Sequence, residues 1–219
     1  GFLFCIGGLA VAQTADKAAF DAGVRLKKEK KCLQAVDSFK RALQYNPSFT
    51  DARYEMAWCQ NELKDYAGAV GNLKQVRTAW PDYAKVYFEL GYAFEQLGRL
   101  DSAVAQYNKC LQINPNYVSV YKRLAGLAYN KEDYNQALQH YQKAVDVSTE
   151  EINDYLFWYR KGFCENNGKE YEKALLSFQK AQAQNKRYAS TYLEIGYAHA
   201  KLKHNDSAIA AYQKAIELE

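Results

Sequence analysis

Residues able to perform covalent or acid–base catalysis form no recognisable catalytic motif in this sequence. Its three histidines have no serine or cysteine partner at a spacing typical of nucleophilic catalysis, and its five cysteines form no C-x-x-C pair. No Gly-rich loop follows a predicted strand, as phosphate binding would require. Aromatic side chains, including 19 tyrosines and 3 tryptophans, are abundant. Because Tyr and Trp dominate binding hot spots, we expect non-covalent recognition, with no catalytic residue, metal or cofactor.

An alanine returns along the chain at a nearly constant interval. The successive steps are 34, 34, 34, 37 and 34 residues between Ala35, Ala69, Ala103, Ala137, Ala174 and Ala208. Four residues after each alanine comes a large apolar residue: Phe39, Leu73, Tyr107, Tyr141, Phe178 and Tyr212. Twelve residues before each comes Gly or Ala: Gly23, Ala57, Gly91, Ala125, Gly162 and Gly196. A period of this length predicts stacked supersecondary units.

The spacing inside each unit is that of a helical hairpin. Apolar residues recur three and four positions apart, as a helix with one buried face requires. The small residues let two helix backbones approach closely, and the large residue fills the same face one turn later. The three prolines, Pro47, Pro81 and Pro115, are also 34 residues apart and end the second helix of a unit.

These columns resemble the tetratricopeptide repeat, a two-helix unit of 34 residues. The third unit matches that pattern best, at Tyr87, Leu90, Gly91, Phe94, Leu100, Ala103, Tyr107 and Pro115. Six units follow in register: 16–49, 50–83, 84–117, 118–151, 155–188 and 189–219. The resemblance implies an all-α fold, a right-handed α-solenoid of antiparallel helix hairpins over residues 13–219. It also implies protein interaction in general.

The longer step falls between the fourth and fifth units. Thr149 replaces the proline, and residues 152–154 are additional. Ser148 and Glu151 have the S-x-x-E spacing of a capping box. We therefore predict that the first helix of the fifth unit begins early and is long.

The two ends of the chain carry separate signals. Residues 1–12 include an apolar run that ends in Ala10-Val11-Ala12, similar to the remnant of a secretory signal peptide. The run is too short to span a membrane. We expect an exported protein, periplasmic or envelope-associated; the alternative is a cytoplasmic chain with a buried N-terminal packing segment. At Glu219 the last unit lacks a polar capping helix, so we expect the solenoid to continue.

Cysteine and charge patterns refine the class of protein. Cys32, Cys59, Cys110 and Cys164 occupy columns where small apolar residues stand in other units, so we expect reduced, buried thiols rather than disulfides. The net charge is only +4, and the basic run over 25–31 does not continue along later units. This pattern indicates a solvated turn and argues against nucleic-acid binding.

The family resemblance also implies where a partner would bind. In tetratricopeptide repeats the concave face is lined chiefly by the second, fifth, ninth and twelfth residues of each unit. On this chain the candidate peptide-binding residues at these positions are Tyr54, Trp58, Asn61, Lys85, Phe88, Tyr92, Glu95, Lys122, Tyr129, Tyr159, Phe163, Asn166 and Tyr197. The ninth position is the most informative, because rings stand there where the family pattern is polar: Trp58, Tyr92, Phe163 and Tyr197.

Two interpretations of these rings remain open. They line a groove for a partner, since exposed apolar patches mark interaction sites, or they stack on one another and tighten the solenoid. The leading hypothesis is a protein-interaction scaffold that holds a partner peptide or helix along an aromatic groove, with Asn61 and Glu95 contacting the partner backbone. The alternative is an architectural, N-terminal tethering arm of a larger cell-envelope protein whose function lies in a downstream domain.

Overall fold

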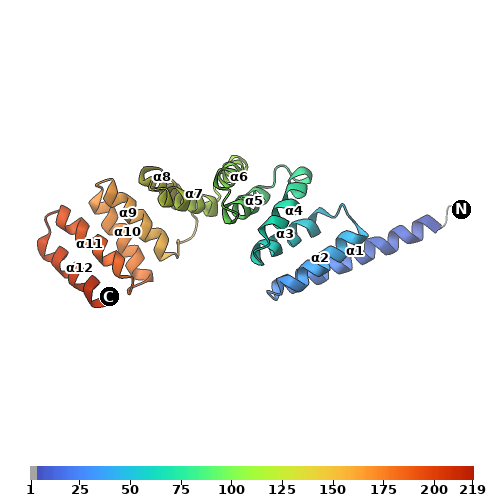
Figure 1. Cartoon of the computed structure of the whole chain (residues 1–219), viewed down its shortest axis with the longest axis horizontal. Helices are drawn as coiled ribbons and strands as arrows, with labels where there is room; N and C mark the ends of the chain where they lie inside the picture. Colours follow the sequence, from blue (N-terminus) through green and yellow to red (C-terminus); the bar gives the residue numbers. More distant parts are fainter. Residues whose placement is uncertain (1–3) are drawn as a thin grey trace. The chain divides into compact units, whose positions relative to one another are not determined.

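The computed structural model describes the backbone of residues 4–219 and the side chains of residues 15–219. Over that range the chain folds into helices and contains no strand. The helices divide between two compact units, residues 1–115 and 116–219, which we describe separately. The prediction of an all-α fold built from helix pairs is confirmed (Figure 1).

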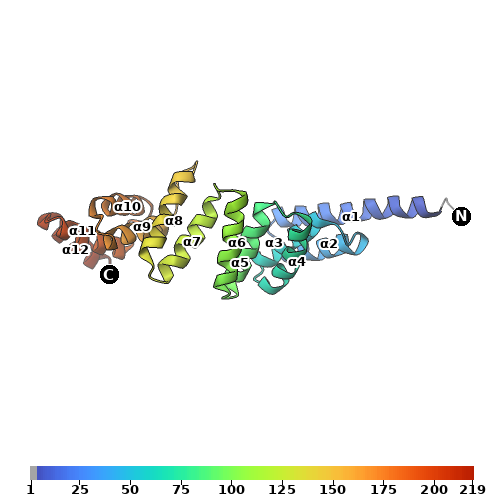
Figure 2. The same ribbon diagram turned by 90° about the horizontal axis from the view of Figure 1, so that it is seen from above.

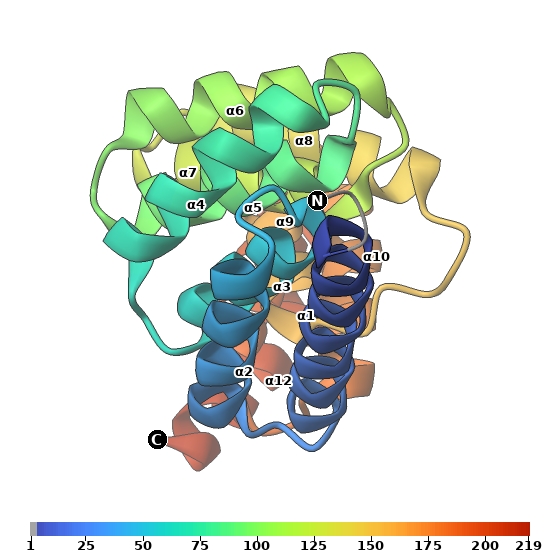
Figure 3. The same cartoon turned by 90° about the vertical axis from the view of Figure 1, so that its right-hand side faces the viewer.

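Unit 1 contains three helix pairs. They are α1 (Phe4–Lys28) with α2 (Cys32–Tyr45), α3 (Thr50–Glu62) with α4 (Tyr66–Ala79), and α5 (Ala84–Gln96) with α6 (Leu100–Ile113). Each pair packs as a hairpin, and α1 and α2 lie side by side in Figure 3. The start of α1 extends beyond α2 in Figures 1 and 2.

Unit 2 contains three more pairs. They are α7 (Val118–Asn130) with α8 (Tyr134–Val147), α9 (Tyr155–Asn167) with α10 (Tyr171–Gln184), and α11 (Ala189–Lys201) with α12 (Asn205–Leu218). Within both units, the first helix of a pair is called helix A here and the second helix B.

The core follows the predicted columns. The recurring alanines are buried, from Ala35 to Ala208. Phe178, on α10, is fully buried and lies against Gly162 of α9, where an added Cβ would come within 2.7 Å of the ring. Tyr107 lies against Gly91 in the same way, with a corresponding distance of 2.5 Å. The absence of a side chain on these glycines therefore lets helix A approach the ring on helix B.

The turn between helix A and helix B also repeats. One residue in each turn has a positive φ: Lys30, Lys64, Gly98, Glu132, Lys169 and Lys203. Left-handed residues of this kind end helices by returning backbone N–H groups to the last carbonyls. In the third hairpin, Gly98 and Arg99 donate to the carbonyls of Glu95 and Phe94. The hairpin geometry is thus closed by backbone hydrogen bonds even where the left-handed residue is not glycine.

A second repeated contact joins successive hairpins. The side chain four residues into helix A donates a hydrogen bond to a carbonyl six residues earlier, in the preceding connection. Tyr87 donates to Pro81 (2.7 Å) and Tyr192 to Lys186 (3.0 Å). Arg53, which replaces the usual apolar residue, donates to Pro47 at 2.6 Å. A guanidinium therefore makes the same connection as the phenol.

The predicted capping box is wrong. Residues 148–154 are not helical, and α9 begins at Tyr155 with the same length as its counterparts in the neighbouring hairpins. The Ser148 hydroxyl donates to the Glu150 carbonyl instead, at 2.7 Å. Asp154 is the N-cap, and its carboxylate accepts the Phe157 N–H at 3.1 Å. Asp154 lies nearer the apolar run that α9 buries, so it caps the helix.

The predicted signal-peptide remnant, residues 1–12, lies partly outside the described residues. From Phe4 onward its backbone belongs to α1 and continues without a break into the first hairpin. Export stays a prediction. No helix in the described part of the chain is long and apolar enough to cross a membrane.

Candidate functional site

Trp58 and Tyr92, on α3 and α5, are the ninth-position rings of unit 1, and both are half-buried. The Lys27 ammonium lies over the Trp58 ring, 4.1 Å from its centroid, and pairs with Glu55 at 2.5 Å. Trp58 also lines a cavity of about 590 Å³ beside the turn between α1 and α2. Tyr92 packs edge-on against Tyr66, with ring centroids 6.0 Å apart. Each ring is thus supported on one side and partly open.

Three of the four ninth-position rings share one kind of support, whereas Trp58 is supported by Lys27. In those three, the first residue of the preceding helix B packs against the ring, as Tyr66 does against Tyr92. In unit 2, Tyr134 packs against Phe163 at 5.3 Å and Tyr171 against Tyr197 at 6.2 Å. Stacking between hairpins therefore occurs, yet it leaves these rings accessible in part. Tyr197 remains 41% exposed.

Two polar residues assigned to the partner backbone already bond within unit 1. The amide of Asn61 donates to the carbonyl and the carboxylate of Glu89, at 3.3 and 2.8 Å. Glu95 accepts a hydrogen bond from Tyr107 at 2.6 Å. In unit 2, Asn166 makes the same pair of bonds to Glu194. These asparagines join neighbouring helices A, which sequence spacing alone did not show.

The remaining predicted residues differ in environment. Tyr54 is buried, Phe88 packs on Tyr107 with centroids 6.1 Å apart, and Lys85 is exposed. Lys122 forms an ion pair with Asp154 at 2.8 Å.

Burial by itself raises the pKa of the Asp154 carboxyl, because it disfavours the charged form. The hydrogen bonds from Lys122 and from the Phe157 amide have a larger, opposite effect and hold the Asp154 pKa below its usual value. Lys122 therefore stabilises the entrance to α9, and its charge is already compensated.

Unit 2 brings three predicted rings together. Tyr129 and Phe163 lie 5.6 Å apart between centroids, and Tyr159 contacts Phe163 at 6.4 Å. The Arg160 guanidinium lies over Tyr129 at 5.2 Å. Burial raises the pKa of Tyr129 to about 12, with the Cys164 side chain adding to the effect. The cluster is an apolar patch with neutral phenols.

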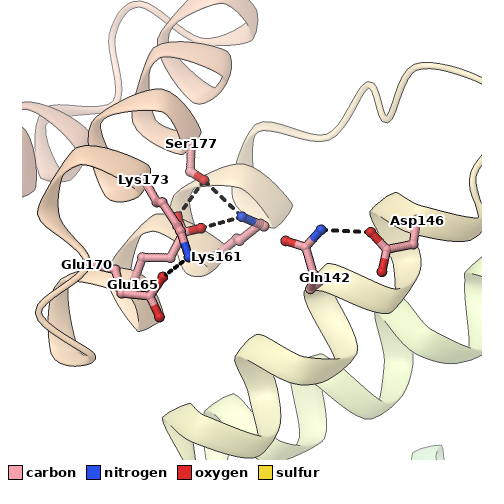
Figure 4. Close-up of polar contacts among 7 residues, drawn as sticks. All are labelled: Gln142, Asp146, Lys161, Glu165, Glu170, Lys173 and Ser177. Atoms are coloured by element: carbon pink, nitrogen blue, oxygen red, sulfur yellow. Dashed lines mark hydrogen bonds and ion pairs between the residues drawn. The ribbon is translucent and has the colours of Figure 1, made fainter.

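A buried charged network joins α9 and α10, and the repeat pattern did not predict it. Glu165 is only 2% exposed; it pairs with Lys161, one helical turn earlier. Ser177 donates to the other carboxylate oxygen of Glu165 at 2.6 Å, and Lys161 donates to Ser177 at 3.4 Å (Figure 4). The positions that Leu90 and Phe94 occupy in the third repeat are occupied by Lys161 and Glu165 in the fifth. These charged residues at apolar positions were the sequence signal that could have revealed the network.

The network borders two cavities of unit 2. One, of about 870 Å³, is lined mainly by α8 together with Glu165, Glu170 and Lys173; the other, of about 400 Å³, includes Lys161 and Ser177. Every charged atom of the network faces an opposite charge or a hydroxyl, so the cluster is satisfied internally. Such a cluster joins helices rather than offering a free base or nucleophile.

The histidines do not gather with other titratable groups into a reactive site. His140 is half-buried beside Tyr121, and burial lowers its pKa. His199 is also half-buried, and its Nδ1 atom lies 3.4 Å from the Nδ1 atom of His204. Within residues 15–219, no group of three or more potential ligands could hold a metal ion.

The four cysteines of the described side chains are free thiols, and three are buried. Burial raises the pKa of Cys110 to about 11 and that of Cys164 to about 12. Burial and a hydrogen bond with the Cys32 side chain raise the pKa of Cys59 still further.

Because the thiolate is the reactive species, Cys59, Cys110 and Cys164 should alkylate slowly in the folded protein. At pH 8 we expect iodoacetamide to modify them on the order of a hundredfold more slowly than in urea. Peptide mass spectrometry over a time course would measure each site, with the urea sample as the control. Rapid modification of Cys164 without urea would contradict the buried-thiol assignment.

Comparisons with known proteins agree with this architecture. Four sequence models of the tetratricopeptide repeat match residues 51–83, 84–117, 122–189 and 189–219. A stretch of 92 residues is 28% identical to heat shock protein STI1 of Saccharomyces cerevisiae. The match covers 42% of this chain and only 15% of that relative.

Solved structures with a similar fold include several repeat proteins. The C-terminal part of a TPR repeat-containing protein from Cytophaga hutchinsonii has a TM-score of 0.72 at 21% identity, over 91% of this chain and 78% of that one. YrrB, described as a TPR protein with an unusual peptide-binding site, has a TM-score of 0.72 at 18% sequence identity, over 84% of this chain and 93% of that one. MamA has a TM-score of 0.67 at 20% sequence identity, over 77% of this chain and 91% of that one. At these identities the likeness shows the fold alone.

Proposed function

The chain belongs to the tetratricopeptide repeat family, and from that premise we propose that it is a protein-binding scaffold without catalytic activity of its own. The partner is an extended or helical protein segment held against the aromatic faces of the A helices. The observation that carries the proposal is the half-burial of Trp58 and Tyr92 at positions where the family pattern is polar.

The physical argument rests on preorganisation. Partly exposed rings are costly to leave in water, and binding a partner removes that apolar surface from solvent. Lys27 supports the Trp58 ring and Tyr66 supports the Tyr92 ring, so each loses little conformational freedom on binding. Rigid aromatic anchors of this kind supply most of the energy in protein interfaces.

The polar part of the proposal changes from the sequence-based hypothesis. Asn61 and Glu95 make internal hydrogen bonds, so they position helices and neighbouring rings rather than lead in partner contact. Lys85, at the start of α5, is exposed and carries no ion pair within the described side chains. It supplies a positive charge on α5, the helix that carries Tyr92, for an acidic group of the partner.

The Trp58→Ala/Tyr92→Ala double variant tests this proposal. Peptides selected on the wild-type chain from a displayed random library serve as defined probes. We expect the double variant to bind them roughly 30- to 1,000-fold more weakly, since each of the two anchors is worth about 1–2 kcal/mol and about 1.4 kcal/mol is tenfold in affinity. Isothermal titration calorimetry would measure the affinity, and far-UV circular dichroism would verify the helical content.

A matched control removes two large apolar side chains elsewhere. Leu176→Ala/Ile209→Ala changes residues that are 63% and 56% exposed on α10 and α12. It should leave the affinity of the same peptides unchanged. Equal binding by the wild type and a folded Trp58→Ala/Tyr92→Ala variant would refute the aromatic-face assignment.

A further inference from the structure

A second aromatic cluster in unit 1 lies at the start of α3 and in the connection between α4 and α5. Three rings meet there at steep angles: Trp80 and Tyr83 have centroids 5.6 Å apart, and Tyr54 lies 6.0 Å from Trp80 and 5.7 Å from Tyr83. They line a cavity of about 550 Å³ together with Asp51, Glu55, Pro81 and Asp82. We call this set the aromatic–acidic pocket.

Trp80 is the ring that the matching positions of the first, third and fifth repeats lack. The C-cap residue that follows helix B is Asn46 in the first repeat, Asn114 in the third and Asn185 in the fifth, but Trp80 in the second. Asn46 and Asn185 each accept a backbone N–H two residues later, at 3.2 and 3.1 Å. The second repeat thus has a large ring, Trp80, in place of a turn-forming amide, and the turn itself does not require that ring.

The charge around these rings is one-sided. The side chains that line the pocket include three carboxylates and no cation. Glu55 is compensated by Lys27, at 2.5 Å. Asp51 and Asp82 are exposed and form no ion pair among the described side chains. The pocket therefore has a local negative charge, although the whole chain has a net charge of +4.

The other two tryptophans show what such a ring attracts in this protein. Lys27 lies over Trp58 and Lys180 over Trp158, each with its ammonium 4.1 Å from the ring centroid. No cation of the described chain lies over Trp80. A cation over a Trp face is attracted by the ring quadrupole, and adjacent carboxylates strengthen the attraction.

We propose that the aromatic–acidic pocket binds a basic side chain, an arginine or lysine, of the protein partner. The planar guanidinium or the ammonium lies against Trp80 and Tyr83, with Asp51 and Asp82 supplying the counter-charge. The occupant's charge complements the pocket, and its aliphatic stem suits the aromatic walls. This proposal rests on the proposed function, because it takes the basic side chain to belong to the protein partner that the scaffold binds.

The test follows the Trp80 indole N–H by ¹H–¹⁵N NMR. The chain has three tryptophans, so three indole N–H signals are expected. The Trp80→Asn variant, which introduces the amide found at this position in the first, third and fifth repeats, identifies the Trp80 signal as the one that disappears. The probes are the peptide acetyl-Ser-Gly-Arg-Gly-Ser-amide and its citrulline counterpart, which has the same shape without the charge. We expect a saturable shift of the Trp80 signal with the arginine peptide and little with citrulline.

Charge variants complete the test. Asp51→Asn/Asp82→Asn keeps the rings and removes both counter-charges, so it should weaken binding of the arginine peptide by about three- to tenfold, the range for losing two surface ion pairs. Glu150→Gln/Glu151→Gln removes the same charge from an exposed loop of unit 2 and should leave the affinity unchanged.

Two results would overturn the inference. One is equal shifts with arginine and citrulline; the other is a response to tetramethylammonium chloride with none to the peptide, which would indicate a small-cation site. A failure of the pocket proposal can be distinguished from a failure of the proposed function. The Trp58→Ala/Tyr92→Ala variant keeps the pocket, so a failure of the aromatic faces would leave the arginine-peptide response intact.

Discussion

Replacing Glu165 with alanine should lower the free energy of unfolding by about 3–5 kcal/mol, because it leaves the Lys161 charge buried without a partner. Lys161 and Ser177 are both buried, and both hydrogen-bond to this carboxylate. Urea unfolding of the whole chain, followed by far-UV circular dichroism, would measure the loss. A decrease below about 1 kcal/mol would contradict the assignment of a buried, mutually dependent network.

The matched control removes the whole network at once. The triple variant Lys161→Met/Glu165→Leu/Ser177→Ala keeps a similar volume and leaves no unpaired polar atom of the network behind. Replacing a buried ion pair by apolar residues is often neutral or stabilising by about 1–4 kcal/mol. We therefore expect the triple variant to be at least as stable as the wild type. If it were as unstable as Glu165→Ala, packing rather than charge would explain the effect.

Replacing Phe178 with alanine should cost about 3–5 kcal/mol, the range for removing a fully buried ring. Phe178 is 0% exposed, and its ring fills the space beside Gly162, where an added Cβ would come within 2.7 Å of it. Leu176→Ala, on the same helix but 63% exposed, should cost less than about 1 kcal/mol. Comparable losses for the two variants, measured by urea unfolding, would contradict the column's structural role.

A double variant tests the contact between ring and glycine directly. Gly162→Ala alone should destabilise, by about 1–3 kcal/mol, since the new Cβ meets the ring. The second repeat carries Ala57 and Leu73 at the two matching positions, and both are fully buried. Gly162→Ala/Phe178→Leu should accordingly lose less stability than the sum of its single changes. Strict additivity would show that the two residues do not interact.

The fold could be predicted in detail from the sequence because it depends on periodic, local constraints. Small residues such as Gly162 and large residues such as Phe178 must recur at fixed spacing for helix A to approach helix B. A hairpin of about 34 residues contains most of its own contacts, so its pattern survives in a single sequence. The capping box failed because one short motif does not decide a helix start; Ser148 bonded to Glu150, and Asp154 capped α9.

The surroundings of the candidate binding residues could be predicted only in part. The repeat register places rings such as Trp58 and Tyr92 at the ninth position, but it does not indicate which side chains support them. Lys27 comes from the preceding hairpin and Tyr66 from the preceding helix B, so their contacts exist only after the repeats pack. Glu95, expected to contact a partner, also accepts a hydrogen bond from Tyr107, which the repeat pattern did not indicate. A polar side chain's partner depends on neighbours that a repeat pattern does not specify.

The periodicity of the sequence was sufficient to determine an all-helical repeat, the positions of its hairpins and the columns that form its core. The pairing of charges and rings required the tertiary structure. Lys161 and Glu165 stand in apolar columns, and only the packing of α9 on α10 makes them a satisfied network. Trp80 meets Tyr54 only where the α4–α5 connection reaches the start of α3. Helix spacing is a property of the local chain, whereas burial and electrostatic pairing arise when separate elements come together.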